Sequence, residues 1–259
     1  MADYWKDRMH ASQNAVSAKT QKEIDKHVRK YYQQISKQVI ADYESLFNEI
    51  VAKQAAGEAI SPATVYAMDK YWAMNAQLTK RLSKMGSKLQ AMMTKLFQIA
   101  YWRSYNSIKI EGLKAFTTLD DAAVQQIINS VWCADGKSWS QRLWNNTQLL
   151  QQTLDEQLIH CVVAGKKTTQ LKELLQDRFN VSYSRADALV RTEIAHIQTE
   201  AAKQRYTDYG IQQVEIWAPE AERRCDVCGK LHKTKYPVGA QVPIPAHTNC
   251  RCCIVPVVE

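Results

Sequence analysis

The chain has 259 residues, of which 46% are hydrophobic and 23% are charged, and its formal net charge is +8. This length and apolar content suffice for one large domain or two modest ones, which excludes a disordered tail or a linker. No segment approaches the roughly eighteen apolar residues of a membrane-spanning helix, and the N-terminal residues lack the apolar core of a signal peptide. We therefore expect a protein kept in a reducing compartment, with no membrane partner.

Positive charge is concentrated in the first part of the sequence. Residues 1–112 contain 17 Lys and Arg against 10 Asp and Glu, whereas residues 113–259 contain 17 against 16. No acidic residue lies between Asp69 and Glu111, an interval that holds eight cations. We interpret part of this run as a DNA-binding face; a surface that meets acidic protein and an ordinary solvated helix face are the alternatives. The candidate DNA-binding residues are Lys80, Arg81, Lys84, Lys88 and Lys95.

Residues 12–56 predict one long helix. Apolar side chains recur every three or four positions from Ile24 to Ile50, which is the spacing of one helix face, and Gly57 is a plausible stop. Such a helix would be roughly 68 Å long, whereas a compact protein of this size has a radius of gyration of about 18 Å. The sequence therefore predicts an elongated multi-helix body, in which this helix projects from the other parts or bridges them.

Helix signals continue along the rest of the chain. Ser61 followed by Pro62 predicts a helix start, Gly86 predicts a stop, and Thr118-x-x-Asp121 resembles a capping box. The predicted helices span residues 61–86, 87–112, 118–131, 139–164, 169–180 and 184–210.

Strand signals are found only near the C-terminus. Residues 214–217 and 253–258 predict two short strands that bracket a cluster of cysteines. The predicted fold class is therefore mainly α, with a small zinc-stabilised α+β module at about residues 212–259. Because the charge balance shifts near Thr117, we expect a basic helical region over residues 1–116 and a second domain over residues 117–259.

The C-terminal cysteines have the spacing of a zinc site. Five of the seven lie between positions 225 and 253, in a Cys-x-x-Cys turn followed by His-x-x-Cys-x-Cys. Zinc takes four sulfur or nitrogen ligands in a tetrahedron, and a Cys-x-x-Cys turn presents two sulfurs to one ion. We predict a structural Zn²⁺ site formed by Cys225, Cys228, His247 and Cys250, with Cys252 as an alternative fourth ligand. Free buried thiols or a disulfide are the other interpretations.

The motifs favour a structural role over a catalytic one. Five possible ligands for four places leave no open coordination position, which a catalytic zinc needs. The signatures of the zinc deaminases, of His-Glu-x-x-His proteases and of phosphate-binding loops are missing from the sequence. A zinc-braced nuclease of the His-Asn-His kind is an alternative because Asn249 lies beside His247, although a second well-placed histidine is missing. We predict that the protein is not an enzyme.

Several C-terminal motifs together resemble one phage protein family. They are Leu189-Val190-Arg191-Thr192-Glu193, Tyr206, Gly210, Ile216-Trp217, Arg224-Cys225-x-x-Cys228 and Pro245-Ala246-His247-x-x-Cys250-Arg251-Cys252. Over roughly residues 120–259 the chain resembles the minor capsid, or head morphogenesis, proteins of tailed bacteriophages, typified by the F protein of phage Mu. The resemblance implies a protein present in few copies, associated with the portal vertex inside the capsid and in some members able to bind DNA. It implies no established catalysis, and we interpret Arg191 and Glu193 as structural.

The motifs and the resemblance together predict a phage minor capsid protein with a role in head assembly. The expected partners are the portal protein, a major capsid or scaffolding protein, and double-stranded DNA bound without sequence specificity. The expected location is the interior of the virion, after assembly in the host cytoplasm. A zinc-braced nuclease and a non-virion zinc-ribbon DNA-binding protein are the alternative functions.

Overall fold

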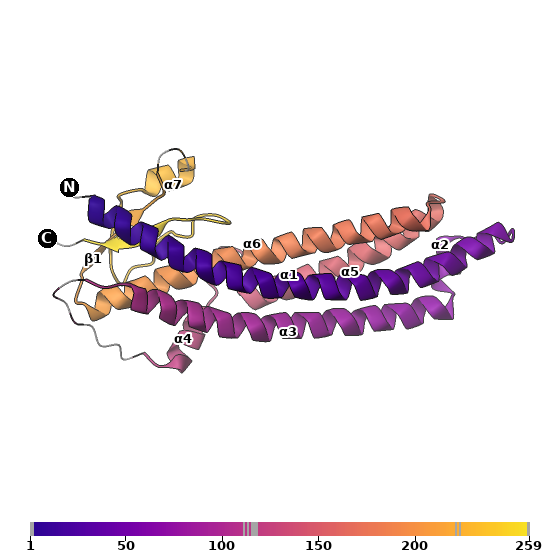
Figure 1. The fold of residues 1–259 in the computed structure, drawn as a ribbon, viewed down its shortest axis with the longest axis horizontal. Helices are drawn as coiled ribbons and strands as arrows, with labels where there is room; N and C mark the ends of the chain where they lie inside the picture. Colours follow the sequence, from indigo (N-terminus) through magenta and orange to yellow (C-terminus); the bar gives the residue numbers. More distant parts are fainter. Residues whose placement is uncertain are drawn as a thin grey trace. The chain divides into compact units, whose positions relative to one another are not determined.

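The computed structural model describes residues 3–110, 112, 114, 119–220, 222 and 224–257 (Figure 1). Its helices are α1 (Tyr4–Ala55), α2 (Pro62–Tyr66), α3 (Asp69–Ser107), α4 (Asp121–Ile128), α5 (Trp139–Val163), α6 (Thr168–Asp208) and α7 (Asp226–Leu231). Its strands are β1 (Gln213–Trp217), β2 (Lys235–Pro237) and β3 (Cys253–Pro256). The mainly α fold with a long N-terminal helix and a small C-terminal sheet is confirmed. Among the described residues, no helix combines the length and the apolar character needed to cross a bilayer.

The chain folds into two compact units that interleave along the sequence. Unit 1 comprises residues 1–25, 92–139 and 188–259, and unit 2 comprises residues 26–91 and 140–187. The long helices α1, α3 and α6 each contribute residues to both units. The boundary expected near Thr117 lies outside the described residues, so the division at that position stays a prediction.

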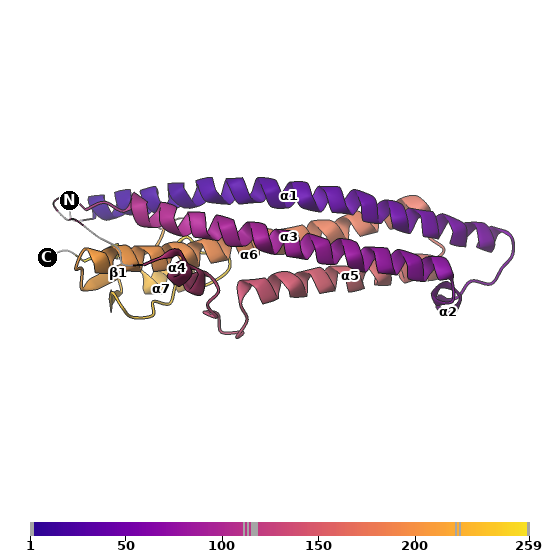
Figure 2. The same ribbon diagram turned by 90° about the horizontal axis from the view of Figure 1, so that it is seen from below.

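Unit 2 is a bundle of four helical segments. Parts of α1, α3, α5 and α6 lie side by side in both views (Figures 1 and 2). The apolar stripe predicted for the long helix is buried in its core and includes Val28, Tyr32, Ile35, Val39 and Tyr43. The Asn146 amide donates hydrogen bonds to the Tyr32 hydroxyl at 3.2 Å and to the Ser182 carbonyl at 2.8 Å. The amide nitrogen of Asn146 is thus paired across three helices, which offsets the cost of burying it.

Gly86 does not end a helix, because α3 continues through it. A Cβ atom at this position would lie 2.7 Å from Cζ3 of the Trp144 ring on α5, which is too close for an ordinary contact. The Trp144 indole N–H donates to the Gln90 side-chain oxygen at 2.8 Å, which holds the ring in place. The predicted break at residues 86 and 87 is therefore wrong, and the glycine provides space for an aromatic ring from a neighbouring helix.

The predicted break between Asn180 and Ser184 is also wrong. Helix α6 is continuous, and the Ser184 hydroxyl donates to the Asn180 carbonyl one turn earlier, at 2.9 Å. A serine whose hydroxyl bonds to the carbonyl of the preceding turn is compatible with a helix interior and does not act as a cap.

Two helix starts have identifiable caps. Ser61 caps α2 as predicted, but this helix is a single short turn and α3 begins separately at Asp69. Helix α4 is capped by Asp120, whose carboxylate accepts the Ala123 N–H at 2.8 Å. Thr118, the predicted cap, lies outside the described residues.

Unit 1 contains the sheet, which is antiparallel with the strand order β2-β1-β3. The two predicted strands are β1 and β3, whose buried residues Ile216 and Ile254 face each other in the register. Strand β2 was not predicted because it has only three residues, ending in Pro237, and proline is unfavourable within strands. Tyr206 of α6 is fully buried in the same core.

The first turns of α1 also belong to unit 1, and they are fixed by the sheet. The Lys6 ammonium lies 3.0 Å from the buried Glu215 carboxylate, and the Trp217 indole N–H donates to the Asp7 carboxylate at 3.0 Å. These partners, more than 200 residues away in sequence, explain why α1 begins at Tyr4 and not near residue 12.

The Gly86–Trp144 contact predicts an unusual mutational effect. Gly86→Ala should lower the free energy of unfolding by about 1–3 kcal/mol, because overpacking outweighs the gain in helix propensity. Urea denaturation measures this, with the exposed neighbour Ser87→Ala as the control that gains propensity without a clash. A Gly86→Ala protein as stable as the original would contradict the packing role.

Candidate metal centre

Cys225 and Cys228 are positioned by the short helix α7. Cys225 precedes the helix with extended backbone angles, φ −76° and ψ 162°. Its sulfur accepts the backbone N–H of Cys228 at 3.4 Å, as a capping side chain does at a helix start. The predicted tight turn is therefore the first turn of a helix, and it brings the two sulfurs to one place.

His247 and Cys250 lie on a turn that leads into β3. The Cys250 N–H donates to the His247 carbonyl at 3.1 Å, and Asn249 between them has a left-handed φ of 61°. Asparagine tolerates this conformation better than most residues do. The Nδ1 atom of His247 lies 2.9 Å from the Thr248 carbonyl oxygen, and its Nε2 atom faces the cysteines of α7.

The structure gathers the predicted ligands into two groups that share Cys228. One group is Cys225, Cys228 and His247, the other is Cys228, Cys250 and Cys252, and the ligand atoms of each group lie within 4.8 Å of one another. His247 Nε2 is 3.3 Å from the Cys225 sulfur and 3.2 Å from the Cys228 sulfur. The Cys228 and Cys250 sulfurs are 3.8 Å apart. Two sulfurs bound tetrahedrally to zinc at about 2.3 Å would be separated by about 3.8 Å.

This cluster could therefore hold a metal ion. The donor set of thiolates and an imidazole is the one that zinc prefers. Cys250 and Cys252 both belong to the second group, so both stay candidates for the fourth ligand position. Cys253, the fifth cysteine of the run, is buried in a separate part of the core with Trp217 and Val255.

Hydrogen bonds and burial shift the pKa values of the four thiols in different directions. The hydrogen bond from the Cys252 thiol lowers the pKa of Cys250, and the same bond raises the pKa of Cys252. The backbone N–H of Cys228 lowers the pKa of the Cys225 thiol, whereas burial raises the pKa of Cys228. Because the thiolate is the form that binds metal, each group supplies one cysteine that ionises readily.

The Arg191-Thr192-Glu193 motif connects three parts of unit 1. The Thr192 hydroxyl accepts the Asn249 N–H at 3.3 Å and so supports the turn that bears His247 and Cys250. The buried Glu193 carboxylate accepts the Trp132 indole N–H at 3.0 Å. Arg191 lines a cavity that reaches Cys250. The sequence pattern marked these residues, but Asn249 and Trp132 lie 57 and 61 residues from them and could not be identified as partners from spacing.

The candidate DNA-binding residues lie on α3, and they do not form one uniform group. Lys80, Lys84 and Lys88 are exposed and follow one another at four-residue intervals along the uninterrupted helix. Arg81 forms an ion pair with Asp42 of α1, with nitrogen and oxygen 3.1 Å apart. Lys95, also exposed, lines a shallow hollow in unit 1.

Part of the positive run is therefore neutralised by acidic residues of α1. Besides Arg81, Lys70 pairs with Glu49 at 2.9 Å and Arg103 pairs with Glu23 at 3.0 Å. Within the described residues, no ion pair involves Lys80, Lys84 or Lys88. Together with the exposed Lys95 and Lys109, which also form no ion pair among the described residues, these lysines keep their charge for a partner, although the Lys88 ammonium lies 5.3 Å from the centre of the Tyr31 ring.

Residues 152–255 match the model of the family described as Phage Mu protein F like protein. This segment belongs to the phage Mu F-like family. It contains the second half of α5, all of α6, the sheet apart from Pro256 and every candidate metal ligand, whereas α1, α2, α3 and α4 lie outside it. No curated protein and no solved structure shows significant similarity to the chain. The phage Mu F-like match supports a role in phage head morphogenesis.

The contact between Thr192 and Asn249 leads to a prediction. Thr192→Val should accelerate hydrogen exchange at the Asn249 amide and weaken the turn by about 1 kcal/mol, the usual contribution of one hydrogen bond. The matched control is Thr207→Val, which removes an equivalent hydroxyl bonded to the carbonyl one turn earlier on the same helix. Equal exchange at Asn249 in the two variants would show that Thr192 does not support the turn.

Proposed function

We propose that this protein is a phage minor capsid protein that acts in head morphogenesis. The observation that carries the proposal is the phage Mu F-like match, which includes every candidate metal ligand. A structural role in assembly, without catalysis, is supported by the number of candidate ligands, since the two groups together hold five and a tetrahedral zinc site needs four. The proposed location is the interior of the virion, after assembly in the host cytoplasm.

The proposed cofactor is a structural Zn²⁺ ion held by Cys225, Cys228, His247 and Cys250. The ion would cross-link α7 to the turn before β3. The segment between these two points has few apolar residues, and only Val242 and Ile244 are buried within residues 232–249. Structural zinc supplies roughly 10–16 kcal/mol of apparent binding free energy in small zinc-finger peptides, which is enough to order such a segment.

The proposed nucleic-acid contact is made by the cations of α3, namely Lys80, Arg81, Lys84, Lys88 and Lys95. Lysines placed along one helix without base-reading partners neutralise phosphates and carry no sequence information. The ion pair with Asp42 makes Arg81 the weakest member of this set, because that pair must open or be shared when DNA binds. We also propose that the protein docks on the portal protein and on a major capsid or scaffolding protein, which rests on the family role alone.

The zinc assignment is tested by metal content and proteolysis. The purified protein should contain one equivalent of zinc, and Cys228→Ser should lose it, with residues 212–259 becoming sensitive to protease while the helices persist. Cys133→Ser, which removes a thiol outside the cluster, is the control. Full zinc content and unchanged protease resistance in Cys228→Ser would refute the structural site.

The DNA contact is tested by a gel-shift assay across a salt series. Replacing Lys80, Lys84 and Lys88 with glutamine should reduce the slope of log affinity against log salt by about 3, since each phosphate contact contributes roughly 0.9. A control with the same loss of charge replaces Lys26, Lys30 and Lys37, which are exposed on α1. Equal slopes in both triple variants would rule out the lysines of α3 as the contact.

The same gels test the nuclease alternative. With Mg²⁺ present, DNA of unchanged length supports the structural role. Shortened fragments that disappear in a His247→Ala variant would replace the proposed function with a zinc-braced nuclease. Detection of the protein in purified phage particles distinguishes a head protein from a non-virion DNA-binding protein.

A further inference from the structure

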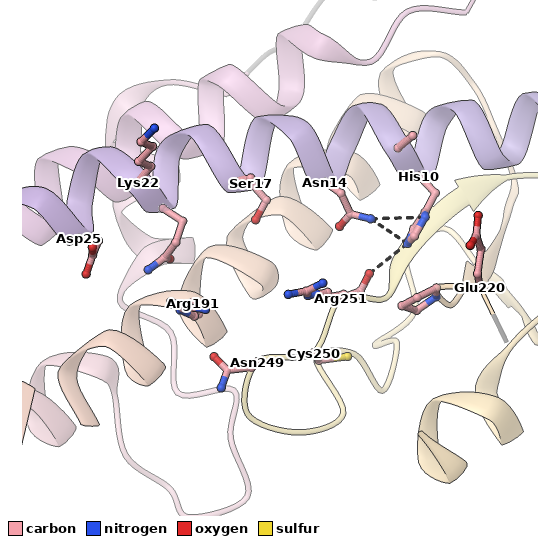
Figure 3. Close-up of a pocket in the computed structure, with 14 residues that line it drawn as sticks. His10, Asn14, Ser17, Lys22, Asp25, Arg191, Glu220, Asn249, Cys250 and Arg251 are labelled. Atoms are coloured by element: carbon pink, nitrogen blue, oxygen red, sulfur yellow. Dashed lines mark hydrogen bonds between the residues drawn. The ribbon is translucent and has the colours of Figure 1, made fainter. Parts of the chain in front are cut away.

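A cavity of about 670 Å³ lies beside the metal centre, entirely within unit 1 (Figure 3). One wall is the stretch of α1 from His10 to Asp25, and the opposite side is formed by Arg191 of α6 and the turn from Asn249 to Arg251. The segment after β1 contributes Glu220. This volume is in the range of about 300–1,000 Å³ that is typical of small-molecule sites.

Three cations from three separate segments line this cavity. They are Lys22 of α1, Arg191 of α6 and Arg251 of the turn before β3. In Figure 3 the Arg251 guanidinium extends into the space between α1 and α6, on the side of Arg191. Positive charges that line one cavity raise its electrostatic potential and favour an anion. Guanidinium groups match phosphate oxygens in particular, through paired hydrogen bonds.

The remaining polar groups of the cavity suit a ligand larger than phosphate. Asn14, Ser17 and Asn249 offer neutral donors and acceptors, and the carboxylates of Asp25 and Glu220 can only accept hydrogen bonds when ionised. A bare phosphate at neutral pH has little to donate and would occupy a small fraction of the space. A nucleotide has phosphate oxygens for the cations and sugar hydroxyl or base amino groups for the carboxylates. We infer that this cavity binds a nucleotide, either free or as a unit of a nucleic-acid strand.

The cavity is held in shape by contacts between α1 and the metal-bearing turn. The His10 ring nitrogen Nε2 lies 3.2 Å from the Arg251 carbonyl oxygen and 2.9 Å from the Asn14 amide nitrogen (Figure 3). Cys250 belongs both to the cavity wall and to the candidate metal ligands. The nucleotide site thus uses side chains other than the lysines of α3 and does not rest on their contact with DNA.

The experiment measures binding by the full-length, zinc-loaded protein, using isothermal titration calorimetry. The probes are dAMP, AMP, a short single-stranded oligonucleotide, inorganic phosphate, and glutamate as a carboxylate. The variant Lys22→Gln/Arg251→Gln removes two cations of the cavity. The control Lys19→Gln/Lys109→Gln removes two exposed lysines of unit 1 that do not line it. Thermal melting shows whether each protein is folded.

Saturable binding of a mononucleotide or of the oligonucleotide, weakened about tenfold or more in the cavity variant and unchanged in the control, supports the site. If the protein binds the oligonucleotide but neither mononucleotide, the ligand is a nucleic-acid strand. If it binds a mononucleotide but not the oligonucleotide, the ligand is a free nucleotide. Equal affinities in the two variants, or no binding of any nucleotide, overturn the proposal. Binding of glutamate as strong as that of nucleotides also overturns it, in favour of a carboxylate ligand. Because Lys80, Lys84 and Lys88 are intact in both variants, failure here is distinct from failure of the gel-shift test.

Discussion

The side-chain amide of Gln13 is the contact on which the unit with the candidate metal ligands depends. It donates to the Tyr206 hydroxyl and to the Ile254 carbonyl, both at 3.3 Å, and all three residues are buried. One polar group of α1 is thereby fixed to α6 and to β3 in an environment where an unpaired amide would be costly. Two further contacts of α1 lie N-terminal to Gln13. They are the ion pair of Lys6 with Glu215 and, closer to Gln13, the hydrogen bond of the His10 ring with the Arg251 carbonyl. The C-terminal module is therefore not an independent attachment, because the opposite end of the chain completes its core and forms one wall of the cavity beside the metal ligands.

This arrangement limits what the family match can describe. The matched segment begins at residue 152, so the wall of α1 lies outside it, together with the lysines of α3. The ligand cluster and the Arg-Thr-Glu motif belong to the shared part, whereas the cavity combines shared and unshared residues. The ion pairs between α3 and α1 also lie outside the matched segment. Three of the eight cations between Asp69 and Glu111 pair with carboxylates of α1, so only part of this run keeps its charge.

Periodic and closely spaced features were predictable from the sequence, and features set by distant partners were not. The apolar stripe of α1 and the Cys-x-x-Cys turn are local patterns with direct physical causes, and the structure has both. Gly86 and Ser184 carry the local signals of helix ends, yet one makes room for Trp144 and the other bonds within its own helix. The support that Thr192 gives to the turn with His247 and Cys250, and the early start of α1, depend on partners far along the chain. Spacing alone cannot choose between Cys250 and Cys252, since both belong to the same group of sulfurs.

The interleaving of the two units sets an order of events during synthesis. Every residue of unit 2 lies between positions 26 and 187, so the four-helix bundle can form once that stretch has left the ribosome. Unit 1 combines the part of α1 up to Asp25 with strand β3, so this part of α1 cannot complete its contacts before β3 has been translated. Domains generally fold as units in the order of their synthesis. Chains truncated before β3 would accordingly carry a finished bundle beside an incomplete unit 1, without the third strand of its sheet.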